Sequence, residues 1–350
     1  MEPLNVDGSF GEGGGQILRT AVCLAVLTRR PVRVSNIRAG REQPGLRPQH
    51  LSAIRILGDL CGAKLEGDEI GSAAVTFFPG ELRGGSMEVD LRTAASITLV
   101  LQAVVPAVSL AGSGLRLDLR GGTDVPWSPT LDYFSTVVRE GFHRAGIDFV
   151  LSATRRGYYP AGGGRAVAEI GTCREASPIV ATTPGRGGGA TILSRCGKLP
   201  IHVAERQAAA ARRVLLDRGI EVARVVATAE ESDSPGSSVA LVSTGAQTLL
   251  GADSLGARGK KAEEVGAEAA EAFASYREGG SCVDPYLADM LAPILCFAKG
   301  ESKLLVPRVT PHLTTSLHVA SLFTDFKTTF EERGKCTVVA IRPGGRRAED

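Results

Sequence analysis

The chain has 350 residues, with 40 Lys or Arg and 38 Asp or Glu, so its formal net charge is +2. Hydrophobic residues make up 43% and aromatic residues 5%, which is typical of a globular protein and excludes disordered and fibrous classes. The near-neutral charge excludes a protein that binds polyanions through its bulk charge, whereas a local anion site stays open.

The compartment is predicted from the cysteines and the apolar segments. The seven cysteines are odd in number and show no CxxC spacing, which favours unpaired thiols in a reducing compartment. The amino-terminal residues have neither a basic nor an apolar segment and are not expected to be a signal peptide. The longest apolar stretch, 97–110, is interrupted by Gln102 and Pro106 and is too short to span a membrane. We therefore expect a cytoplasmic protein.

The first half of the chain predicts a repeated order of elements. A helical apolar pattern covers 16–27 and strand-like alternation follows. The further elements expected are a strand at 31–37, a helix at 48–61, strands at 63–65, 73–78 and 86–91, a helix at 93–110, a strand at 114–119, a helix at 128–145, and strands at 148–154 and 164–169. Copies of such a unit would pack around a shared core.

The pattern changes near Pro184. Strands at 191–194, 221–228 and 238–242 and two helices at 203–218 and 262–276, each strongly polar on one side, are expected there. The motif REGGSC at 277–282 resembles the earlier segments again. We therefore expect a small inserted α/β domain at 184–277, a body formed by 1–183 and 278–342, and a frayed tail at 343–350.

Two segments near the amino terminus suit an anion. In EGGGQILR, three glycines open a helix and leave backbone N–H groups unpaired, with Arg19 one turn further on; a glycine turn that only caps the helix is the alternative. The stretch 28–47 holds six arginines and one glutamate. Arg38 and Arg41 flank Ala39 and Gly40 in a loop, so both guanidinium groups can reach one phosphate. A solvated basic edge is the alternative, but we favour a phosphate or nucleic-acid site.

Three further positions stand out, each with a structural alternative. Gln102 lies in an apolar helix, where its amide must find a partner in the protein or in a ligand. In DPYLADML, Tyr286 and Asp289 share a helix face and could bind a nucleotide, although an acid at a helix start is commonly a cap. His312 follows Thr310 and Pro311 at a predicted helix start, and a neutral imidazole there could be a nucleophile or a base, although a lone histidine is more often structural.

Eight segments together resemble the RNA 3′-terminal phosphate cyclase family. They are GEGGGQILRT, IRAGREQPGLRPQHLSAI, ITLVLQAVVPA, GGTDVPWSPT, GYYPAGGG, HVAER, YLADML and the TPHLTT segment. They occur in the order expected for the family and span nearly the whole chain. The resemblance implies an α/β (α+β) fold of repeated units, each a four-stranded sheet backed by two helices, with a smaller inserted α/β domain.

The resemblance also implies an activity. An ATP-dependent ligase would convert an RNA 3′-terminal phosphate to a 2′,3′-cyclic phosphodiester through covalent histidine–AMP and RNA(3′)pp(5′)A intermediates. His312 would be the nucleophile, and Glu12 would bind a divalent cation, Mg²⁺ or Mn²⁺. The implied ATP contacts are Gln102, Tyr286, Leu287, Ala288, Asp289 and Met290. The implied phosphate or RNA contacts are Arg19, Arg38, Arg41 and Gln49.

Two other functions are weighed against this activity. A non-catalytic branch of the family acts in ribosome assembly and lacks the nucleophilic histidine, so the presence of His312 disfavours it. An enolpyruvyl transferase would need neither the histidine in its TPH context nor the YLAD segment. The expected partner is RNA with a 3′-terminal phosphate and not a membrane, and a homodimer is among the assemblies left open. The scarcity of aromatic residues argues against extensive base stacking.

Overall fold

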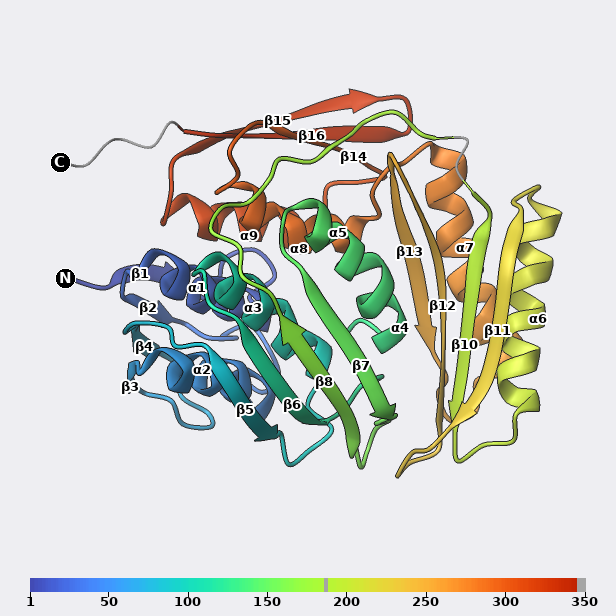
Figure 1. The fold of residues 1–350 in the computed structure, drawn as a ribbon, viewed down its shortest axis with the longest axis horizontal. Coiled ribbons are helices and arrows are strands. Elements are labelled where there is room, and N and C mark those ends of the chain that lie inside the picture. The colour runs from blue at the N-terminus through green and yellow to red at the C-terminus, as the bar shows by residue number, and fades with distance from the viewer. Residues whose placement is uncertain (186–187, 345–350) are drawn as a thin grey trace.

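A computed structural model describes residues 1–185 and 188–344, and three of its sheets share one topology (Figure 1). In each, the first two strands are parallel and the last two form an antiparallel hairpin, so the spatial order is first, second, fourth, third. The predicted repeat of sheet and helices, and with it the fold class, is confirmed.

The first repeat begins the chain. Its helix α2 has Pro48 at its first position, where the missing N–H is not needed, and it ends at Gly62, whose φ of +60° is the left-handed conformation favoured by glycine. Its elements are β1 (Leu4–Asp7), α1 (Gly15–Thr28), β2 (Val32–Ser35), α2 (Pro48–Cys61), β3 (Lys64–Glu66) and β4 (Val75–Phe78).

The second repeat corrects one prediction. The helix expected over 128–145 is observed over 131–144, but it is not a regular α-helix, because a π-helical turn at Phe134–Val138 separates its two α-helical parts. The Thr136 hydroxyl donates to the Asp132 carbonyl at 2.5 Å within this turn, and such side-chain bonds compete with the regular helix. The elements are β5 (Gly85–Asp90), α3 (Ile97–Leu110), β6 (Leu115–Gly121), α4 (Leu131–Tyr133), α5 (Arg139–Arg144), β7 (Phe149–Arg155) and β8 (Gly164–Ile170).

The third repeat is interrupted after its first strand. β16 includes Pro343, and the Gly344 N–H donates to the Asp325 carbonyl at 2.7 Å, so ordered backbone extends into the segment expected to fray, of which 345–350 lie outside the described residues. The elements are β9 (Val180–Ala181), α8 (Pro285–Leu295), β14 (Ser302–Val306), α9 (Pro311–Ser321), β15 (Phe326–Arg333) and β16 (Cys336–Pro343).

The segment between β9 and α8 forms a fourth sheet of different topology. Its order is β11-β10-β12-β13, and α6 and α7 cover one face (Figure 1). It has a hydrophobic core separate from that of the three repeats. We call it the insert. Its elements are β10 (Ala190–Gly197), α6 (His202–Asp217), β11 (Val222–Glu230), β12 (Gly236–Gly245), β13 (Thr248–Leu255) and α7 (Ala262–Gly279).

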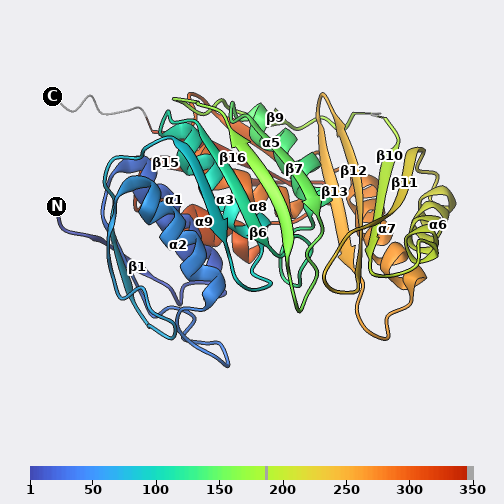
Figure 2. The same cartoon turned by 60° about the horizontal axis from the view of Figure 1, so that its bottom comes forward.

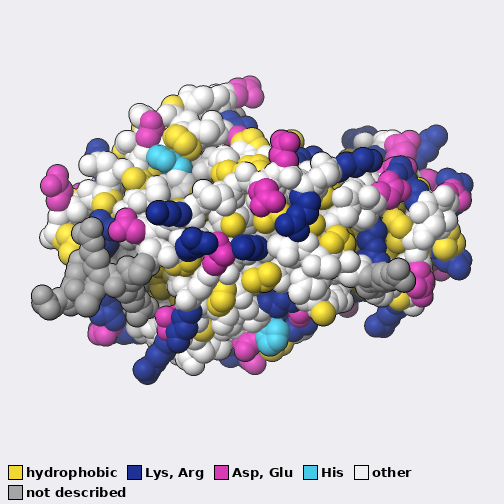
Figure 3. Space-filling model, turned by 90° about the horizontal axis from the view of Figure 1, so that it is seen from above, with side chains coloured by type: hydrophobic (Ala, Val, Ile, Leu, Met, Phe, Trp, Pro, Cys, Tyr) yellow, Lys and Arg dark blue, Asp and Glu magenta, His cyan; other side chains and the backbone are white. Residues whose placement is uncertain are grey.

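The helices α1, α3, α8 and α9 lie between the three sheets of the body, where the repeats share one hydrophobic core (Figure 2). None of the helices in the described parts of the chain is both long and apolar enough to cross a membrane. Basic and acidic side chains occur side by side on the face in Figure 3, in agreement with the small net charge.

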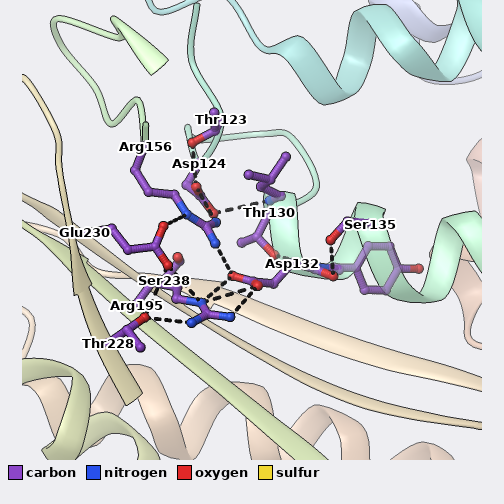
Figure 4. A network of polar contacts seen from close by, with 12 residues as sticks. Thr123, Asp124, Thr130, Asp132, Ser135, Arg156, Arg195, Thr228, Glu230 and Ser238 are labelled. Atoms are coloured by element: carbon purple, nitrogen blue, oxygen red, sulfur yellow. Dashed lines mark hydrogen bonds and ion pairs between the residues drawn. The ribbon is translucent and has the colours of Figure 1, made fainter. Parts of the chain in front are cut away.

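Buried charges join the insert to the body (Figure 4). Arg156, which follows β7 and is 4% exposed, donates to Asp124 of the body at 3.0 Å and to Asp132 at 2.8 Å. Its Nε donates to Glu230 of the insert at 2.8 Å. Arg195 of β10 binds Asp132 from the insert side at 3.0 Å. Every charge in this group has a partner of opposite sign, which a buried ion requires; we call the group the junction.

Candidate functional site

His312 is the second residue of α9. Thr310 caps the helix, because its side chain accepts a hydrogen bond from the Leu313 N–H at 2.9 Å. The same hydroxyl donates to Asp289 Oδ1 of α8 at 2.5 Å. The cap and this contact fix the backbone on either side of His312 relative to α8.

Gln16 fixes His312 from another helix. This buried amide, the second residue of α1, donates to Ser316 Oγ at 2.6 Å and to the His312 carbonyl at 3.3 Å. Gln16 was not predicted as a site residue. A polar residue on the apolar face of a predicted helix is a signal that could have found it, because a buried amide must be paired.

The imidazole of His312 lies beside a carboxylate and stays accessible. Its Nε2 is 3.3 Å from Glu12 Oε2, and the two side chains are 41% and 40% exposed. Partial burial lowers the pKa of His312; Glu12 opposes this by raising the pKa, while Arg19 and Arg41 lower it further. The ring is therefore neutral at neutral pH, with an unprotonated nitrogen available for nucleophilic attack.

Glycines bring the loop before α1 against the site. Gly11 has a φ of +61°, and a Cβ there would lie 2.4 Å from Thr315 Oγ1 of α9; at Gly15 it would lie 2.2 Å from His50 Nε2. No side chain caps α1, whose N-cap is Gly14. The first N–H groups of α1 therefore have no side-chain cap, and an anion site there stays a prediction.

The structure brings Arg19, Arg38 and Arg41 to this end of the body, and among the described residues none of them pairs with a carboxylate. Burial lowers the pKa of Arg19 to about 10. The Nε atoms of Arg19 and Arg38 are buried and lack a described hydrogen-bond partner. Arg38, with a φ of +55°, donates to the Gln43 carbonyl at 3.3 Å, and Arg41 donates to the Glu12 carbonyl at 3.2 Å. Unneutralised guanidinium groups of this kind suit a phosphate.

His50 packs behind these arginines. Burial lowers its pKa to about 3, with further lowering by Arg19, Arg38 and Arg47. Its Nδ1 accepts a hydrogen bond from the Arg47 N–H at 3.2 Å. His50 is therefore neutral at physiological pH and adds no charge to the cluster.

A cavity between α1, α3 and α8 brings Gln102 and Asp289 together. Its volume of about 30 Å³ holds about two water molecules, so a nucleotide could lie only at its mouth. The Gln102 amide has no partner among the described residues, and burial raises the pKa of Asp289 to about 8. The lining residues are Gln16, Arg19, Thr20, Cys23, Leu24, Leu27, Gln102, Ala103, Pro106, Leu110, Asp289, Met290, Pro293 and Ile294.

The segment 286–290 divides between two faces of α8. Asp289 and Met290 line the cavity, and Tyr286 is 47% exposed. Leu287 and Ala288 are buried in the core, where a Cβ at Gly141 would touch Leu287. The structure therefore does not bring Leu287 and Ala288 to the site, because successive helical residues point in different directions.

Gln49 is engaged within the protein. Its Oε1 accepts from the Ser96 N–H at 2.6 Å, and its Nε2 donates to the Ser96 carbonyl at 3.3 Å. Ser96 caps α3. Gln49 therefore ties α2 to the start of α3 and has one amide hydrogen left for a ligand.

Glu12 is the carboxylate nearest His312 that could face a cation. Among the described residues, no group of three or more His, Cys, Asp and Glu side chains could enclose a metal ion. Mg²⁺ commonly keeps several waters and binds one or two carboxylates together with substrate phosphates. The half-exposed Glu12 fits that shared arrangement and not a cage made by the protein alone.

Comparison with known proteins gives one consistent family. A sequence model described as RNA 3′-terminal phosphate cyclase matches residues 10–330. A protein of that name from Desulfurococcus amylolyticus is 44% identical to this chain, covering 92% of each. Proteins of the same name from Pyrococcus furiosus and Methanopyrus kandleri are 43% and 41% identical, covering 94% and 99% of this chain and 95% and 100% of their own.

Proposed function

Because the chain belongs to the RNA 3′-terminal phosphate cyclase family, we propose that it uses ATP to convert an RNA 3′-terminal phosphate to a 2′,3′-cyclic phosphodiester. The observation that carries the proposal is His312, a neutral and accessible imidazole held beside Arg19 and Arg41, which have no carboxylate partner among the described residues.

His312 is the nucleophile of the first step. Its unprotonated nitrogen attacks the α-phosphorus of ATP, the new P–N bond replaces the bond to the β-phosphate oxygen, and pyrophosphate leaves. The proton on the other ring nitrogen passes to solvent or base. Gln16 and Thr310 support this step, because they hold the first turn of α9 from two sides and so reduce the reorganisation needed for attack.

The next two steps use the activated phosphate. An oxygen of the RNA 3′-phosphate attacks the phosphorus of histidine–AMP, the P–N bond breaks as a proton from solvent or base returns to the ring, and the neutral imidazole is released with RNA(3′)pp(5′)A as the product. The neighbouring 2′-hydroxyl then attacks the 3′-phosphorus, loses its proton and expels AMP. The last step needs mainly positioning, for which Arg19, Arg38 and Arg41 supply guanidinium groups toward the phosphate oxygens.

The nucleotide would lie at the mouth of the cavity. Gln102 offers an unpaired amide there, with Asp289, Met290 and the exposed Tyr286 beside it. With a pKa of about 8, Asp289 is largely protonated at pH 7 and does not repel a phosphate. Glu12 would hold a Mg²⁺ or Mn²⁺ ion, which when bound neutralises phosphate charge. We assign Gln49, Leu287 and Ala288 to supporting these elements.

Labelling with α-³²P-ATP tests the covalent step. Wild-type protein with Mg²⁺ or Mn²⁺ should retain an acid-labile, base-stable label, and His312→Ala should lose it. His318→Ala is the matched control, because His318 lies on the same helix, stacked on Phe10 with ring centroids 3.8 Å apart. An unlabelled wild type would contradict the mechanism and favour the non-catalytic RNA-binding relative, whereas a labelled His312→Ala would show that His312 is not the nucleophile.

Location and assembly stay predictions. A cytoplasmic location is supported by the seven cysteines, all of which are free thiols. Light scattering on the full chain would decide between a monomer and a homodimer.

A further inference from the structure

The tryptophan of the chain is held in an unusual position. Trp127 lies in the loop 122–130 between β6 and α4, is 97% exposed and has a φ of +67°. It is the one tryptophan of the sequence. A positive φ on a bulky residue is unfavourable and persists only when its surroundings impose it. A large apolar ring held in water by a strained backbone indicates a binding role.

The loop is anchored at both ends by the junction and its neighbours. Asp124, near its start, binds Arg156 (Figure 4), and the Thr130 N–H at its other end donates to Asp253 of the insert at 2.7 Å. The Thr98 hydroxyl of α3 donates to the Pro129 carbonyl at 2.9 Å. These contacts fix the backbone on both sides of Trp127, so binding a ligand on the ring requires little further ordering.

The loop stands next to the site. Thr98 and Gln102 lie four residues apart on one face of α3, about 6 Å along the helix axis. Because Thr98 binds Pro129 and Gln102 lines the cavity, Trp127 lies at the same end of the body as the proposed nucleotide contacts. Tyr159, 66% exposed, lies in the adjoining loop, where Tyr158 pairs with Asp124. An RNA strand that leaves the site in this direction would meet the exposed rings of Trp127 and Tyr159.

We propose that Trp127 is a stacking platform for a base of the bound RNA, a few nucleotides before the terminal phosphate, with Tyr159 as a second ring; this rests on the proposed function. Single-stranded RNA is commonly recognised by bases stacked on aromatic side chains. A single ring between Pro126 and Ser128 suits one base better than a protein surface, which needs a contiguous apolar patch. One or two such rings also agree with the scarcity of aromatic residues.

Intrinsic fluorescence tests the proposal directly, because Trp127 is the one source of tryptophan emission. Titration with a single-stranded RNA of about ten nucleotides that carries a 3′-phosphate, without ATP, should quench the emission and protect it from acrylamide. In a series with one abasic site at successive positions, quenching should vanish at one position only. If fluorescence anisotropy shows that the RNA binds while the tryptophan emission stays unchanged, the stacking proposal is overturned and the cyclase function is unaffected. If the α-³²P-ATP experiment puts no label on His312, the cyclase function itself is contradicted.

Steady-state kinetics give a second readout. Trp127→Ala should raise the KM for the long RNA about 5- to 150-fold with kcat much less affected, and the rise should shrink as the RNA is shortened toward its terminal nucleotide. Trp127→Phe is the conservative control and should recover most of the affinity. An equal rise in KM for long and short RNA, or no rise at all, would contradict a platform that acts before the terminal nucleotide. A thermal melt checks that the variants are folded.

Discussion

Arginine side chains occupy two contrasting environments in this molecule. At the junction, Arg156 is 4% exposed and contacts three carboxylates at 2.8–3.0 Å. Near His312, Arg19 and Arg38 bury their Nε atoms without a described partner, and no described carboxylate neutralises them. The same side chain therefore joins two parts of the fold in one region and leaves charge uncompensated in the other.

The paired arginines of the junction contribute to stability, whereas the unpaired arginines near His312 are available for a ligand. A buried ion that loses its partner is strongly destabilising, so the charges of the junction depend on one another. Uncompensated charge near His312 lowers the stability of the fold. Burial lowers the pKa of Arg19, and burial together with neighbouring arginines lowers the pKa of His50 and of His312. Groups with perturbed pKa values cluster at functional sites, which agrees with the phosphate site proposed here.

The largest expected effect follows from breaking the junction. Arg156→Ala leaves the buried Asp124 without a cation and leaves Asp132 and Glu230 with Arg195 alone, so the free energy of unfolding should fall by about 3–5 kcal/mol. Urea unfolding followed by circular dichroism measures it. The control is Arg206→Ala, which removes the exposed pair with Glu263 and should change stability by less than about 1 kcal/mol. Equal losses in the two variants would mean that burial does not distinguish these ion pairs.

Substituting the arginines near His312 should have the reverse effect, with activity lost and stability kept. Arg38→Ala and Arg41→Ala should keep or raise stability, because they remove unpaired positive charge, and should lower kcat/KM for RNA cyclisation by about 10- to 100-fold or more, as expected for lost contacts to charged phosphates. Arg38→Lys should recover little, because an ammonium cannot form the bidentate contact. Arg29→Ala, in the same basic segment but paired with Glu81 at 3.5 Å, is the control. Turnover equal to that of wild type would remove Arg38 and Arg41 from the site.

Local sequence patterns predicted some of these elements and one of the two arginine environments. The helix at 48–61 was predicted at its observed bounds, because Pro48 and Gly62 mark its ends. Three strands were not predicted, because their pairing partners are set by tertiary contacts: 248–255, 326–333 and 336–343. The arginines near His312 were predictable from their density in one segment. The junction was not, because Asp124, Arg156, Arg195 and Glu230 come from four separate segments, each unremarkable alone.

The smallest effect concerns the pKa of His312. The Glu12 carboxylate, 3.3 Å from Nε2, favours the imidazolium and raises the pKa, while burial and two arginines lower it further than Glu12 raises it. Glu12→Gln removes the one opposing contribution, so the pKa of His312 should fall. Because the neutral ring is the proposed nucleophile, the acidic limb of self-adenylylation should move to lower pH, even where loss of a cation contact lowers the plateau rate.

An NMR titration of the His312 ring without nucleotide measures this shift apart from catalysis. Glu42→Gln is the control, because Glu42 lies in the neighbouring loop and forms no ion pair with the described residues. A rise in the pKa of His312 in Glu12→Gln would show that the carboxylate does not act on the imidazole through its charge. A fall in the pKa with an unmoved acidic limb would show that a group other than His312 limits the rate at low pH.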